Sequence, residues 1–249
     1  MKLTRRETLT LAAAATALSV VGLPSLASAK EGDMIDLAKL MDVAIPDKVA
    51  GNPDAKVTLI EYASPTCPHC AAFSNVVLGP FIEKYVKTGQ VKLILRPFAR
   101  NTMDAAIFML AEAAAKAADA GAAPAPADPS ASSSEAPADT AAPAAGFSEA
   151  AIAAYENVIA TFFRTQDTWG VSDKPLDAVK AVAFQLGFSE ASFQEALTNQ
   201  ELFTAIETMR NQALNDFGLE GTPTFYLNGK TLSGDKSLEE LSAEIDPLL

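Results

Sequence analysis

Apolar positions in the first half of the chain predict a strand, a helix and a second strand, in that order. Residues 57–63 are apolar and β-branched enough for a strand covered on both faces. Residues 67–85 carry apolar side chains at helical spacing, with a kink expected at Gly79-Pro80. A second strand is expected at 91–95. Two strands joined through a helix in this way should lie parallel with a right-handed crossover.

The middle of the chain is predicted to be helical and the end to form a hairpin followed by a helix. Apolar spacing and capping residues predict helices over residues 103–116, 147–168, 175–187, 189–199 and 200–217. Residues 224–232 read as a hairpin that turns at Asn228-Gly229. Ser237 and Glu240 form a capping box for the last helix. The order is therefore β-α-β, a helical block, then β-β-α, an α/β fold in which the outer pieces share one sheet and the helical block is inserted.

Residues 117–146 interrupt the helical block. They consist mainly of Ala, Pro and Ser, with Asp and Glu as their only charges. Because such a segment has almost nothing to bury, it is predicted to be a flexible loop.

The N-terminal residues up to about Ala29 have the pattern of a secretory signal peptide. A basic start at residues 2–6 is followed by an apolar stretch at 11–23, which is too short to span a bilayer, and by a small-x-small cleavage site at 27–29. Arg5-Arg6 also resembles a twin-arginine signal, so both the Tat and the Sec export routes stay open. The mature protein is expected to be soluble and periplasmic, in a compartment where disulfides persist.

The charge of the chain limits its partners. The net charge is −12, and removal of three basic and one acidic residue with the signal peptide makes it −14. An acidic surface argues against nucleic acids and anionic membrane surfaces as partners. The mature length is sufficient for a buried core without disulfide staples, which leaves the cysteines available for chemistry.

All the cysteine and histidine of the protein lies in the motif Cys67-Pro68-His69-Cys70. Two cysteines three positions apart can close or open a disulfide, which points to thiol–disulfide exchange. Cys67 is expected at the N-terminus of a helix, where backbone N–H groups favour a thiolate. His69 can add positive charge or a hydrogen bond to that sulfur, and Pro68 fixes the turn. Cys70, one turn deeper, is expected to be the resolving or buried partner.

Other kinds of site can also use such a motif. The two cysteines could form a structural disulfide. A zinc or copper site would need Cys67, His69 and Cys70 as ligands, but three ligands in one turn cannot easily surround a metal and the sequence has no further Cys or His. Haem attachment needs His directly after the second Cys, where Ala71 stands. No metal and no cofactor is therefore expected.

These features together resemble the DsbA-like branch of the thioredoxin superfamily. They are a strand that ends just before Cys-x-x-Cys, a long helical insertion, and the segment 221–224 (Gly-Thr-Pro-Thr) that opens a strand. The resemblance runs from about Asn52 to Leu249. It implies a thioredoxin-like fold with an inserted α-helical domain. The expected organisation is a lead-in at 30–51, a thioredoxin-like domain at 52–101 and 218–249, and a helical domain at 102–217 that contains the 117–146 loop.

The resemblance also implies roles for residues outside the motif. Pro223 would follow a cis peptide bond, and the backbone at Thr222 would pair with an extended substrate. Glu61 would be a carboxylate under the disulfide that relays protons to Cys70; otherwise it is a strand residue on a solvated face. Arg96 is a candidate ion-pair partner for Glu61. Trp169 is expected in the core rather than in a substrate groove.

The function indicated is that of an exported thiol:disulfide oxidoreductase that donates disulfides to reduced or unfolded exported proteins. The resemblance implies reoxidation by a membrane quinone-linked partner of the DsbB type. A monomer is expected, because residues 30–51 are too short for a dimerisation domain. The alternatives are a disulfide isomerase or reductase, or a holdase-type chaperone with a largely structural disulfide.

Overall fold

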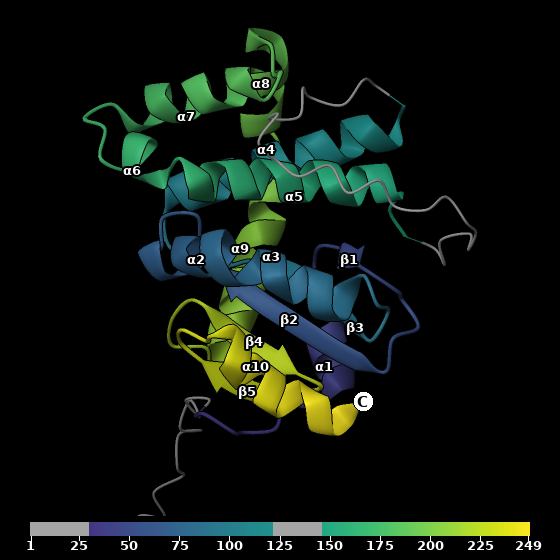
Figure 1. The fold of residues 1–249 in the computed structure, drawn as a ribbon. Helices are drawn as coiled ribbons and strands as arrows, with labels where there is room; N and C mark the ends of the chain where they lie inside the picture. Colours follow the sequence, from purple (N-terminus) through teal and green to yellow (C-terminus); the bar gives the residue numbers. More distant parts are fainter. Residues whose placement is uncertain (1–29, 122–145) are drawn as a thin grey trace, which may run out of the picture.

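The computed structural model describes residues 30–121 and 146–249, and its centre is a five-stranded sheet in the order β1-β3-β2-β4-β5 (Figure 1). The predicted signal peptide at 1–29 and most of the predicted 117–146 loop lie outside the described residues. In chain order the elements are α1 (Leu37–Met41), β1 (Val49–Ala50), β2 (Val57–Ala63), α2 (Pro68–Ala72), η1 (Phe73–Val77), α3 (Leu78–Phe81), η2 (Ile82–Val86), β3 (Val91–Pro97), α4 (Thr102–Asp119), α5 (Glu149–Arg164), α6 (Gln166–Trp169), α7 (Pro175–Gln185), α8 (Glu190–Leu197), α9 (Gln200–Asn215), β4 (Thr224–Leu227), β5 (Lys230–Ser233), α10 (Leu238–Ile245) and η3 (Asp246–Leu248).

The sheet confirms the predicted β-α-β and β-β-α units. β2 and β3 are parallel, β4 pairs antiparallel with β2, and β5 pairs antiparallel with β4. The hairpin turns at Asn228 and Gly229, whose φ angles of 48° and 92° suit the mirror-image turn that the Asn-Gly pair predicted. All the helices between α4 and α9 lie between β3 and β4 in the chain, so the helical block is an insertion. The residue limits of the predicted domains stay a prediction.

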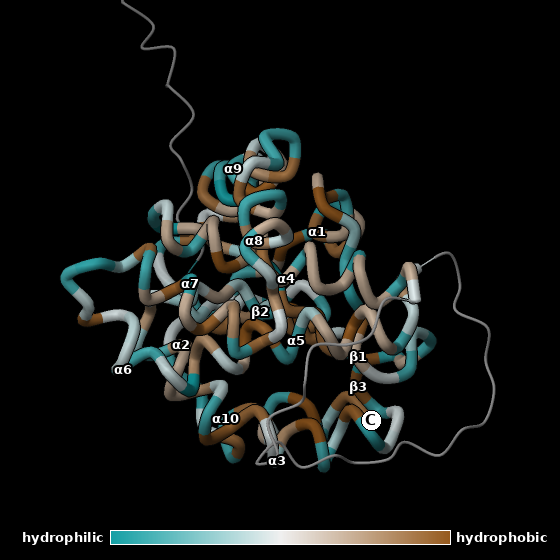
Figure 2. The backbone as a smooth tube through the Cα atoms, turned by 90° about the horizontal axis from the view of Figure 1, so that it is seen from above, coloured by the Kyte–Doolittle hydropathy of each residue, from teal (hydrophilic) through white to brown (hydrophobic). Residues whose placement is uncertain are grey.

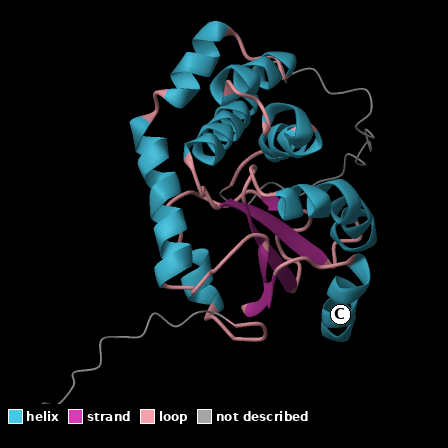
Figure 3. Cartoon of the chain, turned by 90° about the vertical axis from the view of Figure 1, so that its left-hand side faces the viewer, coloured by secondary structure: helices cyan, strands magenta, loops and turns pink. Residues whose placement is uncertain are grey.

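β2 is buried along its whole length, so its alternate side chains face two separate cores. Val57 and Leu59 lie in a cluster with side chains from the helix after β2 and from α10, whereas Ile60 and Tyr62 lie in a cluster with α1 and the end of α9. Figure 2 shows hydrophobic and hydrophilic positions alternating along the outer helices, as expected for helices with one buried face. In Figure 3 the sheet lies between helices on both sides.

The inserted helices form a third core, built mainly by α4 and α5. Trp169 is 2% exposed in this core, and its indole nitrogen donates a hydrogen bond to the Phe162 carbonyl at 2.7 Å. The prediction that Trp169 belongs to the core is confirmed. Cys67 and Cys70 are packed against the same cluster, so the inserted domain covers the motif.

The main differences from the predicted elements have local causes. α4 continues to Asp119, so the prediction of loop at 117–119 is wrong; alanine has the highest helix propensity and Ala115 is buried just before. The predicted 147–168 helix breaks after Arg164, and α6 starts at Gln166. The predicted 67–85 helix contains the two π-helical segments η1 and η2, on either side of Gly79-Pro80.

None of the helices in the described ranges is long and apolar enough to cross a membrane.

Candidate active site

Cys67 is the N-cap residue of α2, directly after the turn that ends β2. Its backbone N–H donates to the Ser64 carbonyl at 2.9 Å, and its carbonyl accepts the first helical hydrogen bond, from Ala71, at 3.1 Å. Pro68 occupies the first helical position, where its missing N–H is not needed and its fixed φ angle favours helix initiation. The sequence therefore places the sulfur of Cys67 at the N-terminus of the helix, as predicted.

Hydrogen bonds lower the pKa of the Cys67 thiol to about 5. The side chain of Cys70 makes the largest contribution; the Thr222 side chain and the backbone N–H groups of Cys70 and His69 add to it, against burial, which acts in the opposite direction. A thiolate at a helix N-terminus is also favoured by the helix dipole. At neutral pH the reduced protein therefore holds Cys67 as a thiolate.

The pKa of Cys70 is shifted in the opposite direction. Burial raises the pKa of this thiol, and its hydrogen bond to Cys67 and the charge of Glu61 raise it further. Cys70 is fully buried, and both cysteines are free thiols in the structure. The pair is therefore polarised, with one sulfur ready to be a thiolate and the other held as a thiol.

Glu61 lies on the face of β2 that the helix after β2 covers, two residues after Leu59. It is 2% exposed, so the alternative of a strand residue on a solvated face is wrong. Burial, together with the charge of Cys67, raises the pKa of Glu61 to about 8. Its Oε1 is one of the buried polar atoms without a hydrogen-bond partner in the described part of the chain. A carboxyl group kept neutral at pH 7 is able to donate a proton.

The suggested ion pair between Arg96 and Glu61 is wrong. The guanidinium binds Asp47 instead, with Nε–Oδ1 and Nη2–Oδ2 distances of 2.8 and 2.5 Å, and donates to the Leu40 carbonyl at 2.6 Å. Arg96 therefore ties the lead-in segment to the sheet. The reason is the pleat: residues 94 and 96 of β3 are on the face that packs against α1, opposite the face of Glu61.

The Thr222–Pro223 peptide bond is cis, as the resemblance implied. This loop faces Cys67, whose Sγ donates to the Thr222 carbonyl at 3.2 Å. The hydroxyl of Thr222 is buried and, among the described residues, has no hydrogen-bond partner. When Cys67 loses its proton, its sulfur can no longer donate to the Thr222 carbonyl. The Thr222 hydroxyl can then donate a hydrogen bond to the thiolate.

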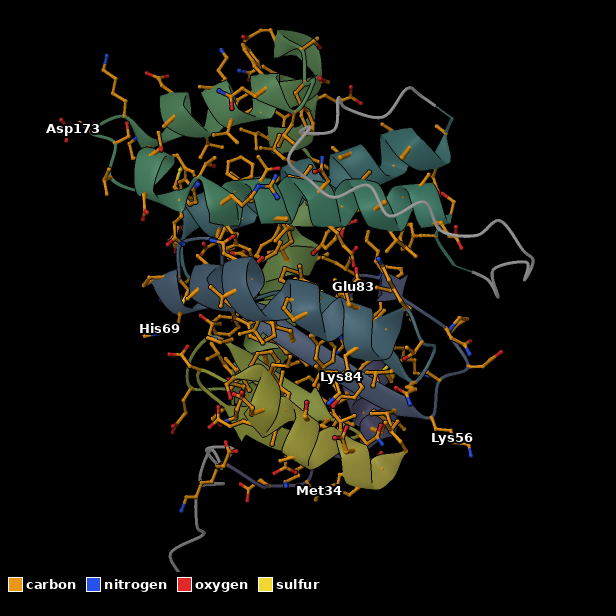
Figure 4. The ribbon with its side chains drawn as sticks, viewed as in Figure 1. Met34, Lys56, His69, Glu83, Lys84 and Asp173 are labelled. Atoms are coloured by element: carbon orange, nitrogen blue, oxygen red, sulfur yellow. The ribbon has the colours of Figure 1, made fainter. Side chains whose placement is uncertain are left out.

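His69 lies at the outer edge of α2 and points away from the body of the protein (Figure 4). Its Nδ1 is 2.7 Å from Oδ2 of Asp235, a residue in the loop between β5 and α10, and both side chains are more than 60% exposed. The ring is thus hydrogen-bonded to Asp235. Within His69, it is the backbone N–H that helps to lower the pKa of Cys67.

Asp104, which the sequence did not single out, holds the loop before Cys67. This fully buried carboxylate in the first turn of α4 accepts hydrogen bonds from the Thr66 N–H at 2.7 Å, the Ser64 hydroxyl at 2.8 Å and the Arg100 N–H at 2.9 Å. Arg100 Nε also donates to the Ser64 hydroxyl at 3.0 Å. The side chain of Asn101 caps α4, and such a residue would predict a helix start but not the contact of Asp104 with the loop before Cys67.

Gln166 was also missed. It is the first residue of α6, and its Nε2 donates to the carbonyls of Pro65 and Cys67 at 2.6 and 3.0 Å. In Figure 1, α6 lies above α2. No sequence pattern connects residues that are a hundred positions apart in this way.

The site does not gather metal ligands. The ring of His69 is hydrogen-bonded to Asp235, and within the described ranges no three His, Cys, Asp or Glu side chains are grouped to hold a metal ion. The chemistry that the arrangement supports is exchange at the two sulfurs.

Comparison with known proteins agrees with this geometry. The chain is 22% and 24% identical to proteins of Rickettsia felis and Rickettsia conorii that are named, provisionally, as protein-disulfide oxidoreductases. Each match covers 82% of this chain and 60% of the relative, so the chain spans less than two thirds of their length.

Two solved structures share the fold. Wolbachia pipientis alpha-DsbA1 is 22% identical with a TM-score of 0.65, over 84% of this chain and 94% of that one. A protein-disulfide isomerase from Novosphingobium aromaticivorans is 19% identical with a TM-score of 0.57, over 81% and 96%. A family model described as thioredoxin matches residues 44–128 and 129–247. Because that match extends over most of the chain, the protein belongs to this thioredoxin family, and its fold is the DsbA-like form in which a helical domain is inserted.

Proposed function

We propose that the protein is an exported thiol:disulfide oxidoreductase that donates disulfide bonds to exported proteins through Cys67 and Cys70. The observation that carries this proposal is the opposite shift of the two sulfurs, with the pKa of Cys67 lowered to about 5 and the pKa of Cys70 raised. A thiol of low pKa gives a thiolate that is a good leaving group. A stable thiolate also stabilises the reduced protein, which makes the disulfide oxidising.

The reaction begins with the Cys67–Cys70 disulfide. A substrate thiolate attacks Sγ of Cys67 and forms a mixed disulfide, while the electron pair of the broken bond goes to Sγ of Cys70. That sulfur must take a proton, because its pKa is raised by burial. The Glu61 carboxyl, with a pKa of about 8, is the buried group able to supply it.

The second step releases the product. Another thiolate of the substrate attacks the substrate sulfur of the mixed disulfide, and Cys67 leaves as a thiolate held by the backbone N–H groups of His69 and Cys70. The substrate has lost two electrons and two protons, and the pair is reduced. Pro68 keeps the two sulfurs close, and the Thr222–Pro223 backbone beside Cys67 pairs with the extended substrate.

The partners are those that the family resemblance implies. The substrates are reduced or unfolded exported proteins, and a membrane quinone-linked partner of the DsbB type restores the disulfide. The protein would act as a monomer in the periplasm after cleavage near Ala29.

The names of the Rickettsia relatives support the reaction class, and the likeness to an isomerase keeps disulfide isomerisation or reduction as a second function. A holdase-type chaperone with a structural disulfide is the third.

The reduction potential of the Cys67–Cys70 pair tests the proposal. The purified mature protein is equilibrated with glutathione buffers of known ratio, and its oxidised fraction is measured by trapping free thiols. A potential near −120 mV supports a disulfide donor, whereas one of about −270 mV overturns it in favour of a reductase. The Cys67→Ser variant separates the chaperone function, because it keeps any holdase action and loses all redox action.

A further inference from the structure

The segment 64–67 is held by the inserted helical domain as well as by the helix that it begins. On one side of Cys67 is the cis-proline loop, with the Thr222 carbonyl 3.2 Å from Sγ. Gln166 approaches the backbone of the same residue and donates one hydrogen bond to the Pro65 carbonyl and one to the Cys67 carbonyl. A primary amide has two N–H donors, so Nε2 of Gln166 is fully used by these two bonds.

Gln166 is itself firmly placed. It is half-buried at the start of α6, and the same short helix ends at Trp169, which is buried and hydrogen-bonded to the Phe162 carbonyl. The rings of Trp169 and Phe162 also meet edge to face, with centroids 5.7 Å apart. The amide therefore extends from a packed part of the helical core to the active-site loop.

The carbonyl that Gln166 binds controls where the sulfur lies. Cys67 is an N-cap residue with extended ψ of 119°, and its carbonyl direction is fixed by that angle. The same conformation places Sγ near the N–H groups of His69 and Cys70 that favour the thiolate. In the oxidised form the covalent bond to Cys70 holds the sulfur in any case. In the reduced form only hydrogen bonds hold it, so Gln166 contributes more to the reduced form.

We propose that Gln166 is a positioning residue for the Cys67 thiolate, through which the inserted helical domain makes the disulfide more oxidising. This inference rests on the proposed function, because it assumes that Cys67 and Cys70 are the redox pair. It extends that function by giving the helical insertion a part in the redox chemistry. Gln166 does not touch the sulfur and acts through the backbone of Cys67.

The test compares Gln166→Met, which keeps the length of the side chain and removes both donors, with Gln212→Met as the matched control. Gln212 is also half-buried in a helix and its Nε2 donates to a backbone carbonyl, that of Asp42, at 2.6 Å. It belongs to α9 and binds the lead-in segment. For each full-length mature protein, the Cys67 pKa is measured from the ultraviolet absorbance of the thiolate, and the redox equilibrium constant from glutathione buffers.

We expect Gln166→Met to raise the pKa of Cys67 and to reduce the equilibrium constant for oxidation of glutathione roughly fivefold, the effect of one hydrogen bond of average net strength. This corresponds to a potential lower by about 20 mV. Unfolding measurements should show that the reduced form loses more stability than the oxidised form. Gln212→Met should change neither the pKa nor the equilibrium constant.

Equal losses of stability in both redox forms, with the Cys67 pKa unchanged, would assign Gln166 a structural role only and overturn the inference. Gln166→Glu provides a second variant of the same shape, in which a carboxylate faces two carbonyl oxygens, and it should raise the Cys67 pKa at least as much. A wild-type protein whose Cys67 does not titrate well below its ordinary value would instead count against the proposed function. The two failures are thus distinguishable.

Discussion

Cys67 and Cys70 are three residues apart in one helix, but their surroundings stabilise opposite protonation states. Exposure does not separate them, because Cys67 is 2% exposed and Cys70 is fully buried. Burial raises the pKa of both thiols, and only at Cys67 do hydrogen-bond donors outweigh it. Cys67 has the N–H groups at the start of α2, the Cys70 thiol and the Thr222 hydroxyl, whereas the charge of Glu61 raises the pKa of Cys70 further. A buried sulfur can therefore be a thiolate wherever backbone and side-chain donors converge on it.

The largest expected effect comes from removing the sulfur of Cys70, the buried partner of the pair. Cys70→Ser and Cys70→Ala have no second cysteine to attack a mixed disulfide on Cys67. Both variants should therefore lose disulfide donation entirely. They should accumulate a mixed disulfide with glutathione, which mass spectrometry detects. They should differ in the pKa of Cys67, because serine keeps a donor and alanine does not. In Cys70→Ala we expect the pKa of Cys67 to rise by about one unit or more, the usual value of a hydrogen bond to a charged group.

If both variants keep the wild-type pKa of Cys67, the hydrogen bond from Cys70 is not the main cause of the low pKa. The N–H groups at the helix N-terminus would then be the main cause of the low pKa of Cys67. The thiolate absorbance of each variant, titrated from pH 3 to pH 9 in roughly half-unit steps, gives this answer directly.

Glu61→Gln tests the surroundings of Cys70 through the pH dependence of folding stability. The pKa of Glu61 is raised from 4.5 to about 8 in the folded protein, so between these pH values the folded chain holds a proton that the unfolded chain has lost. The cost of burying Glu61 therefore grows as the pH rises from 4.5 to 8. Glutamine has no such cost. We expect the variant to gain about 3 kcal/mol relative to the wild type between pH 5 and pH 8.

The contribution of Cys67 has the opposite sign. Its pKa is lowered from 9.0 to about 5, so it stabilises the reduced protein increasingly as the pH rises from 5 to 9, and this stability is lost as the pH falls through 5. Urea unfolding of the reduced wild type and of Glu61→Gln at several pH values separates the two contributions, because the variant lacks the titration of Glu61 and keeps Cys67. A gain that does not depend on pH would show that Glu61 is not protonated in the folded state.

Sequence patterns predicted the features that depend on nearby residues. The strand at Val57–Ala63, the Asn228-Gly229 turn and the Ser237–Glu240 capping box are confirmed, because strand periodicity, turn preference and helix capping act within a few positions. The cis bond at Pro223 followed from the family resemblance.

The features that were missed depend on tertiary contacts. The predicted Arg96–Glu61 pair was wrong because the strand pleat places the two side chains on opposite faces, and Asp47 lies in the lead-in segment, for which no element had been predicted. Gln166 and Asp104 are ordinary helix residues in the sequence. Their contacts with the Cys67 loop arise from the way the inserted domain packs, which no local pattern encodes.

Thr222→Val sharpens the comparison on the side of Cys67. Valine keeps the shape of threonine and removes the hydroxyl that is available to the thiolate. We expect the pKa of Cys67 to rise by roughly half a unit, less than in Cys70→Ala, because the Thr222 side chain makes a smaller contribution. Thr231→Val is a matched control: its hydroxyl is also buried without a hydrogen-bond partner in the described part of the chain, but it lies in β5. An equal shift in both variants would argue against a direct role of the Thr222 hydroxyl.

The smallest effect is expected at the exposed rim of the site, from Asp235→Asn. The carboxylate of Asp235 lies 2.7 Å from Nδ1 of His69, and a negative charge near the start of α2 disfavours the Cys67 thiolate. Its removal should therefore lower the pKa of Cys67, but only by a few tenths of a unit, because both side chains are mostly exposed and water and salt screen them. The shift should disappear in high salt, and a double-mutant cycle with His69→Ala measures how much of it depends on the ring. A shift that persists without the ring would mean that Asp235 acts on the sulfur directly, and the polarity of the pair would then depend on surface charge as well as on the donors around Cys67.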